Sequence, residues 1–147
     1  MALSFRAMTQ EDIGFAVELE QQSFHDAWNT AMLENELDNR LSSYIIMEKD
    51  GLPIGYAGFW LVAGEAQITR VAVLKNERGQ GYGKLLTKEL LELAWRLEAE
   101  AVTLEVRAGN AAAQRAYEAN GFKNAGIRPH YYEDNEDAVI MWVYRGQ

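Results

Sequence analysis

The spacing of hydrophobic residues predicts a long helix in the second half of the chain. Between residues 85 and 97, leucines recur at intervals of four, three and four residues, which places them on one face of an α-helix. These leucines are Leu86, Leu90, Leu93 and Leu97. We expect this face to pack on a sheet, because an amphipathic helix buries its apolar stripe.

Capping signals and similar spacing predict three further helices. The first begins near Thr9, because Thr9 and Asp12 form a capping signal ahead of apolar residues at helical spacing. A second, short helix is predicted for residues 29–37. Asn110 is predicted to be the N-cap of the last helix, which ends at Gly121.

Apolar segments between these helices predict the strands of one sheet. The segments are 4–7, 43–48, 53–62, 65–74, 101–107, 122–128 and 138–145. Turns at 49–51 and at Gly64 join three of them into an antiparallel meander. The strands before and after the long helix should be parallel neighbours, as in a β-α-β crossover. We therefore predict one α/β domain over residues 1–147, with a mixed, mostly antiparallel sheet and helices on both faces.

A glycine-rich turn separates the fourth predicted strand from the long helix. It runs Arg78, Gly79, Gln80, Gly81, Tyr82, Gly83, Lys84. Glycines allow a tight turn and bring free backbone N–H groups to the helix N-terminus, where the helix dipole favours an anion. Residues 70–88 carry a local charge of +4 on a chain of net charge −8. A plain strand-to-helix turn is the alternative, but the charge favours a pyrophosphate-bearing ligand.

The spacing of this turn excludes two better-known phosphate loops. A nucleotide-hydrolysing P-loop requires glycine where the chain has Arg78, and a serine or threonine where it has Leu85. A dinucleotide-binding loop requires a third glycine at position 84 or 86, where the chain has Lys84 and Leu86.

Composition narrows the class of protein further. The chain has no cysteine, which excludes disulfides, thiolate metal sites and a cysteine nucleophile. Its acidic net charge argues against direct nucleic-acid binding. The N-terminus lacks a signal-peptide pattern, and the longest nearly apolar run, 53–64, is too short to cross a bilayer. We expect a cytoplasmic protein with no membrane contact.

The order of these elements resembles the GCN5-related N-acetyltransferases (the GNAT family). The motif Arg78-x-x-Gly81-x-Gly83 matches the family signature Gln/Arg-x-x-Gly-x-Gly/Ala at every defined position. Segments 104–107, 110–113, 120–122, 127–132 and 137–141 are similar, more specifically, to members that acetylate the N-terminal alanine of a ribosomal protein. The resemblance covers nearly the full chain and implies the GNAT fold.

The resemblance also implies acetyl-CoA as cosubstrate and a set of residues that bind it. The strand backbone before the turn would contact the pantetheine arm, the turn would hold the pyrophosphate, and the N-cap of the last helix would also touch the cosubstrate. The residues are Val71, Ala72, Val73, Arg78, Gly79, Gln80, Gly81, Tyr82, Gly83, Lys84, Asn110 and Tyr117.

Two residues are the candidates for acid–base chemistry. By resemblance, Glu105 is the general base and Tyr117 is the acid that protonates the departing thiolate. Read without the resemblance, Glu105 is a solvated strand carboxylate and Tyr117 a core side chain. A glutamate with its ordinary pKa of about 4.3 is a weak base, which suits an α-amine (pKa near 8) better than a lysine (near 10.4).

The acceptor cleft is expected to include aromatic and cationic side chains. The candidates are Trp28, Arg128, Tyr131 and Tyr132. Packing at a strand end is the alternative for the two tyrosines. His25 and His130 are isolated, and no carboxylate cluster has ligand spacing, so we expect no metal. Trp60, Trp95 and Trp142 are predicted to lie in the core.

The function expected from this sequence is transfer of acetyl from acetyl-CoA to the N-terminal alanine of small-subunit ribosomal protein eighteen. Without a cysteine or a Gly-x-Ser-x-Gly motif, direct attack in a ternary complex is expected. The alternatives are acetylation of another amine (a peptide, polyamine or antibiotic) and a non-catalytic CoA-binding module.

Overall fold

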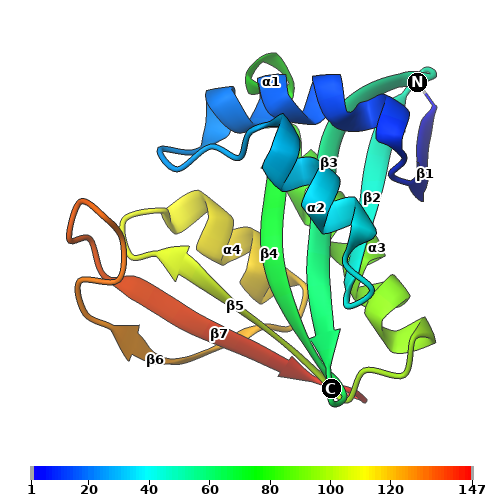
Figure 1. Cartoon of the computed structure of the whole chain (residues 1–147). Helices are drawn as coiled ribbons and strands as arrows, with labels where there is room; N and C mark the ends of the chain where they lie inside the picture. The colour runs from blue at the N-terminus through cyan, green and yellow to red at the C-terminus, as the bar shows by residue number, and fades with distance from the viewer. Residues whose placement is uncertain (1, 147) are drawn as a thin grey trace.

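The computed structural model describes residues 2–146, which form a sheet with helices on both faces (Figure 1). The strands are β1 (Leu3–Ala7), β2 (Ser42–Lys49), β3 (Leu52–Val62), β4 (Glu65–Val73), β5 (Ala101–Arg107), β6 (Lys123–Arg128) and β7 (Ala138–Tyr144). The helices are α1 (Ile13–Ser23), α2 (Thr30–Asp38), α3 (Tyr82–Arg96) and α4 (Ala111–Ala119). The predicted α/β fold class is confirmed.

The strand order within the described residues is β1-β2-β3-β4-β5-β7-β6. All neighbouring strands are antiparallel except β4 and β5, which are parallel as the sequence predicted. These two strands pair only at their beginnings, from Glu65 with Ala101 to Gln67 with Thr103. Beyond that point they diverge, and Figure 1 shows the sheet opening between them.

A β-bulge in β4 coincides with this divergence. In the pairing of β3 with β4, Gly58 lies opposite Arg70 while Phe59 lies opposite Ile68, which leaves Thr69 as an extra residue. A bulge bends its strand and increases its twist. Thr69 lies two residues after Gln67, the last residue of β4 that pairs with β5.

The sheet separates two hydrophobic cores, and the side chains of β2 point alternately into one core and the other. Ile45 and Met47 point to the core that α3 covers, whereas Tyr44 and Ile46 point to the core that α1 and α2 cover. Successive strand residues face opposite sides, so a strand covered on both faces is apolar at consecutive positions.

The N-cap predicted at Asn110 is present in the structure, and Asn29, which was predicted only as the start of the second helix, is an N-cap as well. Asn29 accepts a hydrogen bond from the backbone N–H of Met32 at the start of α2. Asn110 accepts one from Ala113 at the start of α4. Near Thr9 a short 3-10 turn, η1 (Gln10–Asp12), precedes α1, and the Asp12 carboxylate accepts from the Thr9 N–H at 2.8 Å.

Two expectations require correction. The helix predicted to begin at Leu85 begins at Tyr82, because Gly81 already serves as its N-cap and the glycine turn merges into the first helical turn. The three tryptophans expected in the core are only half-buried. Trp60 donates its indole N–H to Glu36, Trp95 packs at the edge of the α3 core, and Trp142 stacks on Tyr144.

Candidate active site

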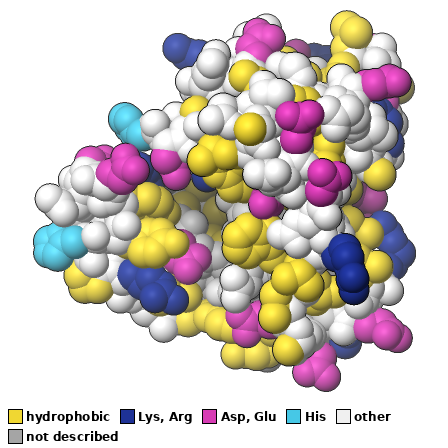
Figure 2. All heavy atoms as spheres, viewed as in Figure 1, with side chains coloured by type: hydrophobic (Ala, Val, Ile, Leu, Met, Phe, Trp, Pro, Cys, Tyr) yellow, Lys and Arg dark blue, Asp and Glu magenta, His cyan; other side chains and the backbone are white. Residues whose placement is uncertain are grey.

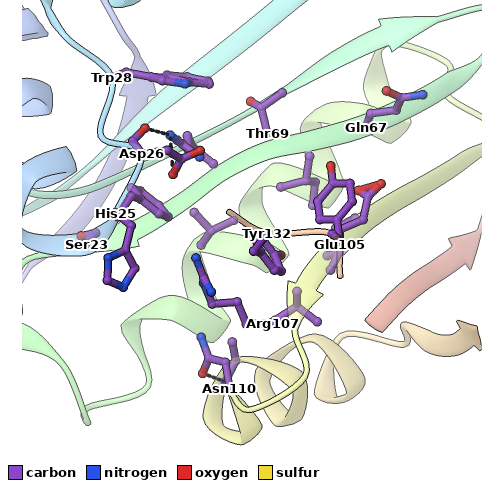
Figure 3. A pocket seen from close by; sticks show the side chains of 18 of the residues that line it. Ser23, His25, Asp26, Trp28, Gln67, Thr69, Glu105, Arg107, Asn110 and Tyr132 are labelled. Carbon is purple, nitrogen blue, oxygen red and sulfur yellow. Dashed lines mark hydrogen bonds and ion pairs between the residues drawn. The ribbon is translucent and has the colours of Figure 1, made fainter. Parts of the chain in front are cut away.

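A cavity of about 930 Å³ opens where β4 and β5 diverge. The loop between α1 and α2 forms one side, and β5, α4 and the loop between β6 and β7 form the other. Figure 2 shows a hollow in the surface with hydrophobic side chains around it. In Figure 3, Asp26 and Trp28 lie across the cavity from Glu105 and Tyr132.

The edge of β4 that faces this cavity offers free backbone groups. Val71, Ala72 and Val73 pair with β3 on one side, whereas pairing with β5 ends at Gln67. Val71 lines the cavity, and the Val73 carbonyl accepts a hydrogen bond from Arg78 Nε at 3.0 Å. An unpaired strand edge of this kind can hydrogen-bond an extended amide-bearing ligand.

The glycine turn has the backbone that its sequence predicted. Gly79 and Gly81 have φ of +81° and +84°, in the left-handed region that favours glycine. Gly83 lies inside α3 without a positive φ, and an added Cβ would meet no heavy atom within 4 Å. Neither backbone conformation nor packing therefore requires glycine at 83. Close approach of a ligand to the helix N-terminus is the remaining physical reason.

The charge around this turn differs from what the sequence suggested. Arg70 does not face the turn: its guanidinium pairs with the buried Glu20, with Nε–Oε2 at 3.0 Å. Arg78 is held by Val73 and by the hydroxyl of Ser23. The remaining cations of the cluster, Lys75, Lys84 and Lys88, have exposed side chains.

Glu105 extends from β5 into the cavity. It pairs with Arg128, whose Nε lies 3.5 Å from Glu105 Oε1, and 28% of its side chain is exposed. Arg128 itself is more than half exposed and lies beside the cavity mouth. An ion pair is weak when its charged atoms are this far apart and both side chains are partly exposed to solvent. The Glu105 carboxylate can therefore accept a proton or a hydrogen bond from a ligand.

Tyr117 reaches the same cavity from α4. Its ring packs edge-on against Phe122, with the centroids 5.7 Å apart. Burial raises the pKa of Tyr117 well above its ordinary value of 10, so the phenol keeps its proton at neutral pH. Within residues 2–146 its hydroxyl has no hydrogen-bond partner, which leaves it as a free donor toward the cavity.

The loop after β6 contributes two aromatic side chains. Tyr131 and Tyr132 line the cavity and pack edge-on at 5.0 Å. The guanidinium of Arg107 lies over the Tyr132 ring and also binds Asp134 and Glu136, which fixes the loop against β5. Burial raises the pKa of Tyr132 to about 12. Trp28 and Asn110 line the cavity too, whereas Ala72, Val73, Arg128 and the glycine turn from Arg78 to Lys84 are not part of its lining.

The sequence analysis missed the buried carboxylate of Glu20. This side chain is fully buried on the face of α1 that carries Ile13 and Ala16. It accepts hydrogen bonds from Arg70, from the Tyr56 hydroxyl and from the Trp28 N–H. A charged residue on the hydrophobic stripe of an amphipathic helix was the signal that could have revealed it.

The described residues show no group of three or more His, Cys, Asp or Glu side chains that could hold a metal ion. What the cavity offers is a carboxylate, a protonated phenol and an unpaired strand edge beside a helix N-terminus. This set can deprotonate an amine and donate to a leaving group. Among residues 2–146, no helix is long and apolar enough to cross a membrane.

Comparison with known proteins identifies the family. The family model described as "Acetyltransferase (GNAT) family" matches residues 13–122. The chain belongs to this family. As a GNAT protein it is an N-acetyltransferase, and enzymes of the family take the acetyl group from acetyl-CoA.

Relatives of this GNAT protein share most of its length. A Bacillus subtilis protein named as a putative [ribosomal protein bS18]-alanine N-acetyltransferase is 42% identical over 140 residues, 94% of this chain and 93% of that one. The Escherichia coli protein named as the corresponding enzyme is 31% identical, covering 88% and 89%. The crystal structure of the Escherichia coli ribosomal-protein-S18-alanine N-acetyltransferase matches with a TM-score of 0.89 at 28% identity, over 99% of this chain and 96% of that one.

Proposed function

We propose that this GNAT enzyme acetylates the α-amine of the N-terminal alanine of ribosomal protein bS18. The observation that carries the proposal is that Glu105 and Tyr117, from neighbouring elements, line one cavity beside the unpaired edge of β4. The names and the 42% identity of the Bacillus subtilis relative support this choice of acceptor.

Acetyl-CoA fits the groups found along β4 and the glycine turn. The backbone of Val71, Ala72 and Val73 would hold the pantetheine arm, and the turn from Arg78 to Lys84 would hold the pyrophosphate. The open space at Gly83 and the exposed Lys84 support this placement. Bound in this way, acetyl-CoA supplies an activated thioester. Asn110 lies at the cavity edge, where it would contact the same molecule.

In the proposed reaction, one side chain takes the proton that the acceptor nitrogen loses, and another gives a proton to the departing sulfur. The neutral acceptor amine attacks the acetyl carbon as the carbon–sulfur bond breaks, and Glu105 takes the proton that the nitrogen loses once the new carbon–nitrogen bond has formed. Tyr117 donates its hydroxyl proton to the departing sulfur, which leaves as a thiol. Glu105 then loses its proton to solvent and the Tyr117 phenolate regains one, which restores both groups for the next turnover. Burial raises the pKa of Tyr117 above its ordinary value of 10, so the donor carries its proton at neutral pH. Transfer is direct, without an acyl-enzyme.

The weakness of a carboxylate base favours an α-amine acceptor. At pH 7 an α-amine with a pKa near 8 is roughly 10% neutral, whereas a lysine side chain is well under 0.1% neutral. An N-terminal amine therefore needs less help from Glu105 than a lysine does. Trp28, Arg128, Tyr131 and Tyr132 surround the mouth of the cavity and are proposed to contact the acceptor chain.

The proposal is tested by mass spectrometry of peptides incubated with acetyl-CoA. One peptide carries the bS18 N-terminus beginning with alanine, and its control has the same sequence with a blocked α-amine and a free lysine. We expect one acetyl group on the α-amine and none on the control. The variant Glu105→Gln should bind acetyl-CoA as the wild type does but lose turnover about 100-fold or more. Modification at lysine alone would overturn the proposed acceptor.

A further inference from the structure

Arg70 is the centre of a buried cluster at the wall of the cavity. Its Nε and Nη2 lie 3.0 and 3.1 Å from the two carboxylate oxygens of Glu20. Nη2 also donates to the backbone carbonyl of Asp26 at 3.1 Å. The guanidinium carbon lies 4.1 Å from the ring centroids of both Phe24 and Trp28. Only 10% of the Arg70 side chain is exposed.

All the loop residues held by this cluster line the cavity. Phe24, Asp26 and Trp28 belong to the segment 24–28, which joins α1 to α2 and contains no regular secondary structure. Glu20 reinforces the hold, because it accepts the Trp28 N–H at 2.8 Å. The ion pair between Glu20 of α1 and Arg70 of β4 therefore contacts this segment at three of its residues, Phe24, Asp26 and Trp28.

We propose that Arg70 is a positioning residue, which fixes residues 24–28 as the wall of the acceptor site opposite Glu105. The inference rests on the proposed function only for the identity of the acceptor. A guanidinium can bind a carboxylate with two parallel hydrogen bonds while its faces stack on aromatic rings. A lysine would keep the positive charge but lose the two parallel hydrogen bonds to the carboxylate and the stacking on the aromatic rings. Arg70 touches neither the reacting amine nor the thioester in this role.

Arg70→Lys is the test, with Arg6→Lys as the matched control. Arg6 also forms a two-pronged pair, with Asp12 at 2.7 and 2.8 Å, and also joins the start of α1 to the sheet, but it does not line the cavity. For Arg70→Lys we expect the KM for the acceptor peptide to rise about tenfold or more, with the KM for acetyl-CoA within twofold of wild type. Arg6→Lys should lower the Tm without raising either KM.

Hydrogen exchange tests the same inference without turnover. In Arg70→Lys the Trp28 amide should exchange about tenfold faster or more, while the amides of α1 and β4 stay protected. Glu20→Gln keeps the side-chain volume and removes the carboxylate, so it should show the same selective increase in the exchange of the Trp28 amide. It provides a second test if Arg70→Lys does not fold. This measurement separates the two proposals, because it gives a result even if the alanine peptide is not acetylated.

Any one of three results would overturn the inference. One is a Trp28 amide that exchanges at the wild-type rate in Arg70→Lys. A second is an acceptor KM that stays within twofold of wild type, or that rises only together with the KM for acetyl-CoA. An equal acceptor effect in Arg6→Lys would also refute it, because the change would then reflect general loss of stability.

Discussion

Tyr117 and Glu105 illustrate how much of a site depends on single side chains. Both were predicted from the sequence by resemblance, and the structure brings them to one cavity, although their catalytic roles stay predictions. Burial explains why the Tyr117 phenol stays protonated. No sequence pattern contains that information, because the desolvation arises from the packing of α4 on the sheet.

Replacement of Tyr117 by phenylalanine should separate chemistry from folding. The hydroxyl has no partner within the described residues, so its removal leaves no donor or acceptor unpaired and the ring still packs on Phe122. We expect kcat to fall by about 100-fold with the free energy of unfolding changed by less than about 1 kcal/mol. Steady-state kinetics and urea unfolding measure the two quantities. An active Tyr117→Phe enzyme would remove this residue from the mechanism.

Gly83 offers a test of the phosphate site that is independent of catalysis. A methyl group at 83 meets no protein atom and replaces glycine within a helix, so Gly83→Ala should keep or raise stability by up to about 1 kcal/mol. Affinity for CoA should nevertheless fall about tenfold or more, because the methyl group would stand where the ligand approaches the backbone. Calorimetric titration with CoA measures the affinity. Unchanged binding would place the pyrophosphate elsewhere.

Arg70 shows the limit of reading charge from sequence. Its charge was counted with the cations around the glycine turn, but a strand directs successive side chains to opposite faces, and this one meets Glu20, fifty residues earlier in the chain. Local charge counts do not reveal such long-range pairs. The left-handed backbone at Gly79 and Gly81 could be predicted because glycine adopts this conformation without a steric penalty.

At the scale of elements, the decisive feature is the divergence of β4 from β5. The sequence predicted that the two strands are parallel neighbours, which the structure confirms, but it did not predict that pairing stops at Gln67. The bulge at Thr69 lies close to the end of this pairing and bends the strand there, and a bulge depends on the cross-strand environment. The Thr69 hydroxyl shares a hydrogen bond with the Tyr44 hydroxyl at 2.7 Å, and the Tyr44 ring lies against Gly58.

A methyl group at Gly58 should disturb this bulge. An added Cβ would lie 2.0 Å from the Tyr44 ring, so the ring must move away from Thr69. We expect Gly58→Ala to lower the free energy of unfolding by about 1–3 kcal/mol, measured by urea denaturation. Gly14→Ala is the control, because Gly14 lies exposed in α1 with no atom within 4 Å of the added carbon. Equal stabilities of the two variants would contradict the proposed packing.

At the scale of the whole molecule, buried tyrosines make the stability of the folded protein depend on pH in the alkaline range. Burial is the main cause that raises the pKa of Tyr44, Tyr56, Tyr117 and Tyr132 above the ordinary value of 10. For Tyr44 and Tyr56, the nearby carboxylates of Glu36 and Glu20 raise it further. A tyrosine with a raised pKa holds its proton more tightly in the folded state than in the unfolded chain.

The sign of the resulting pH dependence follows directly. Below pH 10 both states keep these protons, and the full stability is present. Above pH 10 the unfolded chain releases them while the folded protein does not, so stability falls by about 1.4 kcal/mol per pH unit for each such tyrosine. Tyrosinate absorbance should therefore rise in two steps, the second coinciding with the loss of the circular dichroism of the helices. Ionisation of all seven tyrosines along one curve near pH 10, in a protein that stays folded, would contradict this picture.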